Sequence, residues 1–528
     1  MTSEPSKALE KRWRAICKLI LKEEVGDFSD YVPWLVERNE PIMHRKSSIS
    51  GKETTYAMGE YAENSKWIDF SEVDLEKQFE PLSINEIKDI DSLVEALQDR
   101  FYYTGNIVLG NSKYIERSSD VSDSFYVFES ARIGDSKYIG CCTMGRLVED
   151  MYGCNAMGES AFCIKCPETY RDKRLFEVWM SQNCNDCYYS YGLNGCTECF
   201  FCFHLKSKRY AIGNLELEPS RYKEIKKKLL SEIVEELRRN KRVPSLIDIV
   251  AKSRIQKPKL PTIKKESPPT TSMKPIDDAF SRTCKLIFGR TIPGGVEVYS
   301  DWLTMHIQSM EGCSSVLSDE GFYRGDYGNY FDLPKDRLIG FREGSILGEN
   351  AKLSKEEVGG LSFGNAHEFI GRIAFFSTEI YVEPNENTID CPLTGYSSNS
   401  YRTFPLVYSK YCAYTFWPRS CEHLFGCRQM FDSAFCINCY YSVKLTRCFE
   451  MDGCRDCSDS YFCHNCENVR NSMFCFNTKN KRYAIGNVEV GMEEYMRIKK
   501  VLLGFVSKEL NAKKSLGLGI FNLSGYEK

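Results

Sequence analysis

The sequence predicts an α+β protein that is mainly β, built as a tandem duplication of one module. Residues 201–214 (FCFHLKSKRYAIGN) and 474–487 (FCFNTKNKRYAIGN) are nearly identical, and a shift of 273 positions aligns 137–237 with 410–510 without a gap. Within each copy a polar turn pair followed by an aromatic residue or cysteine recurs about every 12 residues, as in Asp123-Ser124 and Asp135-Ser136. Such a rhythm is typical of stacked short strands. We therefore expect a β-solenoid-like, cysteine-rich sheet in each copy, with a small mixed α/β domain as the alternative.

The repeat also sets the expected domains. A second register, at 267 positions, aligns Cys17 with Cys284 and Tyr56 with Tyr323 at the front of each copy. Internal repeats of this kind define the units of the fold. The expected units are a mixed α/β front part (1–103), a cysteine-rich repeat (104–237), a linker (238–277), a second front part (278–378), a second cysteine-rich repeat (379–510) and a tail (511–528).

Each cysteine-rich repeat ends in a predicted amphipathic helix. The stripe Tyr222, Ile225, Leu229, Ile233 and Leu237 has helical spacing, and the second copy repeats it at Tyr495, Ile498, Leu502, Val506 and Leu510. We expect each helix to cap the open end of the stacked strands. The linker between the copies is basic and rich in proline, which favours an extended spacer with a short helical turn at 246–251.

The overall composition predicts a folded chain in a reducing compartment. The net charge is −3, which gives no global attraction to nucleic acid or an anionic membrane. The sequence shows no apolar run of membrane-spanning length and no signal-peptide core, so we expect a cytoplasmic protein. The 25 cysteines are then expected to be buried thiols or metal ligands rather than disulfides.

Paired Cys-x-x-Cys motifs suggest zinc. Two Cys-x-x-Cys motifs together can supply the four soft ligands of one tetrahedral site. The candidate metal ligands are Cys163, Cys166, Cys184 and Cys187 in the first copy and Cys436, Cys439, Cys454 and Cys457 in the second.

The duplication weakens the zinc interpretation. Cys187 aligns with Ser460 and Cys454 aligns with Ser181, so no complete set of four cysteines occurs at shared positions. Exchange of cysteine for serine, valine or leucine is typical of a tightly packed interior. Structural thiols are the favoured interpretation, and zinc binding or redox chemistry remain alternatives.

Two small basic clusters accompany the repeated Lys-Arg-Tyr-Ala-Ile-Gly-Asn segment. Such residues beside aromatic side chains can hold phosphate groups, but a wet surface beside a structural turn explains them equally well. The candidate nucleic-acid or anion contacts are Lys206, Lys208, Arg209, Lys479, Lys481 and Arg482, with Lys257, Lys259, Lys264 and Lys265 in the linker.

With these residues in view, the chain resembles a family of uncharacterised cysteine-rich proteins found mainly in microbial and phage genomes. The resemblance rests on Phe201-Cys202-Phe203 followed by 208–214, on Phe474-Cys475-Phe476 followed by 481–487, and on Glu493-Glu494-Tyr495. The front part keeps the segments 38–40 (Arg-Asn-Glu) and 50–52 (Ser-Gly-Lys). Only Cys17, Cys284 and Cys313 remain in the two front parts, so the zinc ribbons of that family are expected to be absent here. The family has no established activity, and the resemblance therefore implies architecture alone.

No catalytic constellation emerges from these motifs. The leading hypothesis is a non-enzymatic binding or scaffold protein that docks on a larger protein or ribonucleoprotein assembly through its two modules and basic linker. A zinc-binding RNA- or DNA-associated protein is the first alternative, and a metal- or thiol-dependent enzyme is the second. The sequence leaves the oligomeric state and the identity of the partner open.

Overall fold

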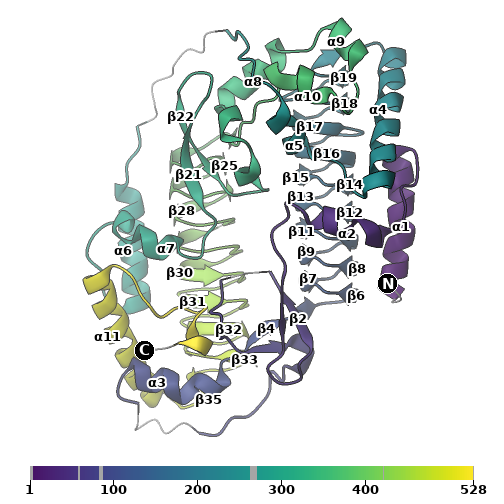
Figure 1. The fold of residues 1–528 in the computed structure, drawn as a ribbon. Helices are drawn as coiled ribbons and strands as arrows, with labels where there is room; N and C mark the ends of the chain where they lie inside the picture. The colour runs from purple at the N-terminus through teal and green to yellow at the C-terminus, as the bar shows by residue number, and fades with distance from the viewer. Residues whose placement is uncertain (1–3, 58–59, 82–86, 262–269, 420, 527–528) are drawn as a thin grey trace.

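The fold is mixed α/β with mostly strands, and its largest element is a parallel sheet that nearly closes on itself (Figure 1). The computed structural model describes residues 4–57, 60–81, 87–261, 270–419 and 421–526. Two stacks of short strands dominate it: the first stack spans residues 108–216 and the second stack spans residues 380–489. They stand side by side and run in opposite directions, so that the start of each lies beside the end of the other (Figure 1).

In the first stack, most strands pair in parallel with a strand twelve residues further along, as Lys137 does with Glu149, and the stack ends in the antiparallel pair β19–β20. We call each twelve-residue step a layer. Two rows of strands alternate along the chain and meet at the long strand β16. The strands are β5 (Val108–Leu109), β6 (Lys113–Glu116), β7 (Ser119–Ser122), β8 (Phe125–Phe128), β9 (Ala131–Gly134), β10 (Lys137–Gly140), β11 (Thr143–Arg146), β12 (Glu149–Tyr152), β13 (Asn155–Gly158), β14 (Ala161–Ile164), β15 (Pro167–Tyr170), β16 (Lys173–Gln182), β17 (Tyr188–Asn194), β18 (Thr197–Phe200), β19 (Arg209–Ile212) and β20 (Leu215–Glu216).

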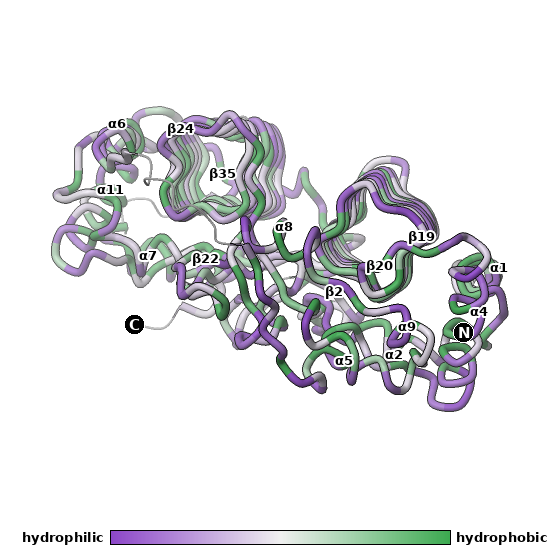
Figure 2. Tube along the Cα trace, turned by 90° about the horizontal axis from the view of Figure 1, so that it is seen from above, coloured by the Kyte–Doolittle hydropathy of each residue, from purple (hydrophilic) through white to green (hydrophobic). Residues whose placement is uncertain are grey.

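The second stack has the same parallel pairing at twelve-residue offsets, as between Lys410 and Glu422. Viewed from above, the layers of each stack superpose closely (Figure 2). Its strands are β23 (Ile380–Val382), β24 (Glu386–Ile389), β25 (Leu393–Gly395), β26 (Ser398–Tyr401), β27 (Leu406–Val407), β28 (Lys410–Ala413), β29 (Glu422–Phe425), β30 (Ala434–Tyr440), β31 (Phe449–Asp452), β32 (Tyr461–Glu467), β33 (Phe476–Lys479), β34 (Ala484–Ile485) and β35 (Val488–Glu489).

Inside each stack the buried side chains recur at every third residue. Cys184, Cys187, Cys196 and Cys199 all follow this period and all are fully buried. The residue before an interior position repeatedly adopts a left-handed conformation, with φ of +53° at Asp186 and +55° at Glu198. A left-handed residue turns the chain sharply. Each layer therefore bends at three-residue intervals and presents one side chain inward from each side.

Interior serines and cysteines make the same hydrogen bonds, which explains why they replace each other between the two stacks. Ser136 N–H donates to Ser124 Oγ at 3.0 Å, and Cys154 N–H donates to Cys142 Sγ at 3.3 Å, in each case from one layer to the preceding one. Each of these side chains in turn donates to a carbonyl two residues earlier, as Cys142 Sγ does to Gly140 O. Since both residue types satisfy the same backbone groups, either fits the interior.

Helices cover the outer side of each stack (Figures 1 and 2). The first stack is flanked by α1 (Glu4–Leu21), α2 (Phe28–Val36), α4 (Pro219–Asn240) and α5 (Leu246–Lys252), and the second by α6 (Lys274–Phe288), α7 (Ser300–Thr304) and α11 (Met492–Lys513). The predicted stripes are confirmed as the buried faces of α4 and α11. These two helices run lengthwise beside the stacks rather than across their ends (Figure 1). No helix in the described ranges is long and apolar enough to cross a membrane.

The front part of each half reaches across to the other stack. The elements of residues 43–105 are β1 (Met43–Lys46), β2 (Glu53–Tyr56), β3 (Trp67–Asp69), α3 (Ile90–Leu97) and β4 (Tyr103–Gly105). Trp67, Leu97 and Tyr103 share a core with the second stack. The corresponding elements of residues 310–369 are β21 (Met310–Ser314), β22 (Gly321–Gly325), α8 (Phe341–Asn350), α9 (Lys355–Gly360) and α10 (Ala366–Phe369). Leu347 and Leu353 share a core with the first stack. This exchange fixes the two halves to each other.

The repeated Lys-Arg-Tyr-Ala-Ile-Gly-Asn segment is where the exchanged parts dock. Leu353 N–H donates to Gly213 O at 2.9 Å, and Arg100 Nη1 donates to Gly486 O at 2.8 Å. The asparagine that follows each glycine bonds the last layer: Asn214 accepts from Phe203 N–H and donates to Phe203 O, and Asn487 does the same with Phe476. Each amide thus substitutes for the next strand. The most conserved part of the repeat is accounted for by these structural contacts.

Candidate binding groove between the stacks

A groove with a volume of about 1080 Å³ runs along the first stack. Its floor is the row of strands β7, β9, β11, β13, β15 and β16, together with the end of β17. Its other wall combines the start of the second stack with residues of the exchanged segment, including Phe341 of α8. The groove is thus a product of both halves of the chain.

The groove is elongated along the axis of the first stack. Its floor begins at Asp120 and continues to His204, which lie seven layers apart. Parallel strands are spaced by about 4.8 Å, so the floor is about 34 Å long. A site of these proportions fits an extended polymer better than a compact metabolite, which a short, enclosed pocket would bury more completely.

Two glycines on the floor each support a flat side chain from the next layer. A Cβ on Gly158 would meet Tyr170 Cδ2 at 3.1 Å, so the absence of a side chain lets the ring lie against the floor. In the same way, Gly134 lies beside the stem of Arg146. We call each such arrangement a platform.

An acidic residue beside each glycine accepts a hydrogen bond from the polar end of the platform side chain. Asp135 Oδ2 accepts from Arg146 Nε at 3.0 Å, and Glu159 Oε1 accepts from the Tyr170 hydroxyl at 2.9 Å. The two platforms are therefore built alike from residues at the same sequence offsets, two layers apart. The Arg171 guanidinium lies over the Tyr170 ring, 4.8 Å from its centroid, so this platform combines an aromatic and a cationic group. Planar groups of these kinds are suited to stacking against a ligand.

The opposite wall adds aromatic side chains. Tyr381 is 40% exposed, and its hydroxyl donates to Glu379 Oε1 at 2.6 Å. Trp417 packs edge-on against Tyr327 at 5.8 Å, and the Arg419 guanidinium lies over the Trp417 ring. The groove thus has aromatic side chains on both sides, Tyr170 on the floor and Tyr381 and Trp417 on the wall.

Burial shifts the pKa of several titratable groups of the groove in the direction that favours their neutral forms. Desolvation raises the pKa of Glu168 to about 8, against the lowering effect of the hydrogen bond from Tyr330. It raises the pKa of Glu379 to about 7 and that of Asp120 to about 6. Desolvation also lowers the pKa of His204 to about 4, and this imidazole shares a hydrogen bond with Phe375 O at 2.9 Å.

Several charged side chains on the floor are paired, while Lys206 at its end is exposed. Arg132 pairs with Glu40, Arg146 with Asp135, and Glu159 with Arg171. Protonated carboxyls add hydrogen-bond donors without adding charge. The groove therefore favours a polar ligand of low charge.

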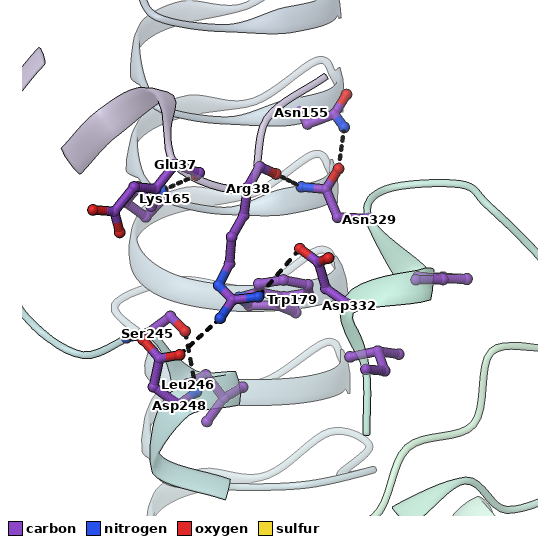
Figure 3. Close-up of polar contacts among 12 residues, drawn as sticks. Glu37, Arg38, Asn155, Lys165, Trp179, Ser245, Leu246, Asp248, Asn329 and Asp332 are labelled. Atoms are coloured by element: carbon purple, nitrogen blue, oxygen red, sulfur yellow. Dashed lines mark hydrogen bonds and ion pairs between the residues drawn. The ribbon is translucent and has the colours of Figure 1, made fainter. Parts of the chain in front are cut away.

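A partly exposed ion-pair junction connects segments from distant parts of the chain (Figure 3). Arg38 pairs with Asp248 at 2.7 Å and with Asp332 at 3.3 Å, and so joins the N-terminal segment, α5 and the exchanged segment. Asn329 donates to the backbone carbonyl of Arg38 and accepts from Asn155 Nδ2. The neighbouring residues of the Arg-Asn-Glu stretch also serve structure, because Asn39 donates to Cys141 O and Glu40 pairs with Arg132.

The structure does not bring the candidate zinc ligands of the first copy together. Cys163 pairs with Leu175 in the next layer, and Cys187 lies one layer further. Two layers span about 10 Å, whereas two sulfurs on one zinc ion lie within about 4.6 Å of each other because each Zn–S bond is about 2.3 Å long. A Cys-x-x-Cys motif in this fold places its cysteines on successive sides of a layer.

The second set is dispersed in a different way. Cys436 and Cys439 point inward from one layer, while Cys454 and Cys457 point inward from the next, at positions that continue Ser442 and Leu445. The four therefore occupy four different sides of the interior. Among the described residues, no group of three or more His, Cys, Asp or Glu side chains is placed to hold a metal ion.

The buried thiols are also poorly suited to nucleophilic chemistry, because they are closed to solvent. Burial raises the pKa of Cys166 and Cys187 well above the ordinary value. At Cys454 burial also raises the pKa, but hydrogen bonds with Cys457 and Cys466 outweigh it and lower the pKa to about 6. A cysteine nucleophile reacts as the thiolate, which a lowered pKa and solvent access favour. These cysteines are explained by packing and by the interior hydrogen bonds.

The candidate basic contacts are scattered. Lys206 is exposed at the end of the groove floor, whereas Lys208 pairs with Glu216 and Lys479 pairs with Glu76. Arg209 and Arg482 lie over the rings of Tyr210 and Tyr483, and Lys481 is half-buried. In the linker, Lys257 and Lys259 are exposed, while Lys264 and Lys265 lie outside the described residues.

Comparison with known proteins identifies no relative: no family model, curated protein or solved structure matches this chain. The site must therefore be interpreted from its own geometry. Sequence reasoning did not find Glu168, Tyr170, Glu379 or Tyr381. The available signal was the recurrence of Gly, an acid and a planar residue at 134–146 and again at 158–170.

Proposed function

We propose that the chain is a binding and scaffold protein made of two β-solenoid modules that arose by tandem duplication. The twelve-residue parallel pairing and the three-residue inward period support the solenoid assignment. Matching details in the two halves support the duplication. Glu177 and Glu450 each accept a backbone N–H from the segment that follows α4 or α11, donated by Leu246 and Ile520 respectively.

We further propose that the groove holds an extended segment of a polymer that belongs to a larger assembly. The observation that carries this proposal is the continuous floor of eight layers, walled by the second half of the chain. Interlocked halves make the groove rigid before the ligand arrives, which reduces the entropic cost of binding. Buried thiols and dispersed metal candidates give no comparable support to a thiol- or metal-dependent enzyme.

Photo-crosslinking in the native source tests the groove independently of ligand class. Gln182 is exposed on the floor, and its replacement by p-benzoylphenylalanine should give a covalent adduct with one macromolecular species on irradiation. The same photoreactive residue at Tyr114, which is 39% exposed elsewhere on the first stack, should give none. Equal adducts from both positions, or no adduct from position 182, would refute the proposal.

The linker is proposed to add an electrostatic contact with the same assembly. Lys257→Glu combined with Lys259→Glu should weaken capture of the crosslinked partner and flatten its salt dependence, because two exposed cations become anions. Lys257→Gln with Lys259→Gln is the control for charge removal and should have a smaller effect in the same direction. Unchanged capture across a salt series would remove the linker from the binding surface.

A further inference from the structure

Beyond the proposed groove-binding function, on which this inference rests, we propose that the ligand is a proline-rich segment of a partner protein in the polyproline II conformation. The inference begins from the spacing of the two platforms. Arg146 over Gly134 and Tyr170 over Gly158 are two layers apart. Strand spacing makes this distance about 9.6 Å.

That spacing matches the repeat of one ligand conformation. A polyproline II helix has three residues per turn and rises about 9.3 Å in one turn. Prolines at every third position would therefore lie over successive platforms on the same face of the peptide. Aromatic-lined grooves are a recurrent means of binding such peptides, whose backbone is already extended and loses little entropy on binding.

The hydrogen-bonding groups of the groove complement the same ligand. Proline has no N–H, so a proline-rich segment offers backbone carbonyls as acceptors and needs donors from its receptor. The exposed amides of Gln182 and Asn194 lie further along the floor, and the protonated carboxyl of Glu168 lies beside the Tyr170 platform. The low net charge of the groove suits an uncharged segment.

The length of the floor sets the size of the ligand. About ten residues of polyproline II extend roughly 31 Å, close to the length of the floor. The wall opposite Tyr170 carries Trp417 and Arg419, so the peptide would lie between aromatic surfaces of the two halves. A peptide bound here would contact both stacks.

Fluorescence anisotropy with the full-length protein and a fluorescein-labelled ten-proline peptide tests the proposal. We expect saturable binding, and we expect Tyr170→Ala to raise Kd about ten-fold because one stacking platform is lost. Tyr114→Ala is the matched control: Tyr114 is 39% exposed, close to the 38% of Tyr170, and it stacks on Tyr126 outside the groove. This control should leave Kd unchanged. A three-proline peptide, which reaches one platform at a time, should bind at least about ten-fold more weakly.

Three results would overturn the assignment. They are a Kd above about 1 mM for the ten-proline peptide, equal affinity of the Tyr170→Ala and Tyr114→Ala proteins, and equal binding of a ten-residue Gly-Ser peptide. Binding of dextran or of a ten-nucleotide oligouridylate that Tyr170→Ala abolishes, in place of peptide binding, would assign the groove to a glycan or to RNA instead. In each of these cases crosslinking from position 182 remains positive, so failure here is distinct from failure of the groove-binding function.

Discussion

Replacing Gly213 or Gly486 with alanine is expected to lower the free energy of unfolding by about 3 kcal/mol or more. A Cβ on Gly213 would lie 2.3 Å from Leu353 Cδ1, and one on Gly486 would lie 2.2 Å from Leu97 Cδ2. Both leucines come from the exchanged segments, so the added methyl group forces apart the contact that joins the halves. Urea unfolding followed by circular dichroism and by tryptophan fluorescence measures the loss.

The backbone contribution can be separated from this steric effect. Gly289, the left-handed residue that ends α6, has φ of +74° and nothing within 4 Å of its Cβ position. Gly289→Ala therefore reports only the cost of a left-handed alanine, about 1 kcal/mol. In a Leu353→Ala background, Gly213→Ala should become much less harmful because the obstructing side chain is gone. If Gly213→Ala and Gly289→Ala destabilise the protein equally, the exchanged contact is not what requires glycine.

Sequence patterns were sufficient for the local elements but not for how the halves interlock. The helical stripes of α4 and α11 were predicted because apolar residues at a 3.6-residue period must share one buried face. Docking of Leu97 and Leu353 was not predictable. Each leucine contacts a glycine in the other half of the chain, and a local period carries no information about such partners.

The cysteine motifs illustrate a second limit. Spacing alone made Cys163-x-x-Cys166 equivalent to a zinc knuckle, because both arrangements place two cysteines three residues apart. The three-residue inward period, visible in Cys196, Cys199 and Cys202, was the signal that separates them. The twelve-residue repeat alone could not distinguish these two arrangements. It gives the number of residues in one layer, but not which side of the layer a residue occupies.

The linker was predicted as an extended spacer with a short helical turn at 246–251, because its prolines break regular structure, and α5 confirms the turn. Part of it instead packs against the first stack: Ser245 caps α5, and Leu246 and Val250 are fully buried. Arg337 then bonds Ser253 O at 2.6 Å. Apolar residues between the prolines were the available evidence for packing, but the partners they pack against lie far away in the sequence.

Two buried carboxyl groups should make the free energy of unfolding decrease as the pH rises. Burial raises the pKa of Glu177 and of Glu450 to about 7, against an unfolded value of about 4.3. The folded state therefore retains a proton that the unfolded state releases. The stabilisation is fully present below about pH 4.3 and is lost as pH rises from there through 7, at a cost of about 4 kcal/mol per group.

Glu177→Gln isolates this effect from carboxylates with lowered pKa, such as Glu357, which act in the opposite direction. Glutamine imitates the protonated carboxyl at every pH, and Glu177 Oε1 has no hydrogen-bond partner in the described part of the chain, so the amide fits there. The variant should equal the parent below about pH 4 and exceed its unfolding free energy by about 4 kcal/mol near pH 9.

Glu450→Gln should change the pH dependence of the unfolding free energy in the same way, but with a constant loss of stability at every pH. Both oxygens of Glu450 accept N–H groups, from Asn438 and Ile520, and an amide satisfies only one of them. Glu80→Gln, at an exposed position, is the control and should track the parent at all pH values. Parallel curves for the parent and Glu177→Gln between pH 5 and 9 would show that Glu177 is ionised in the folded protein. Lys165, the nearby buried cation, would then outweigh desolvation.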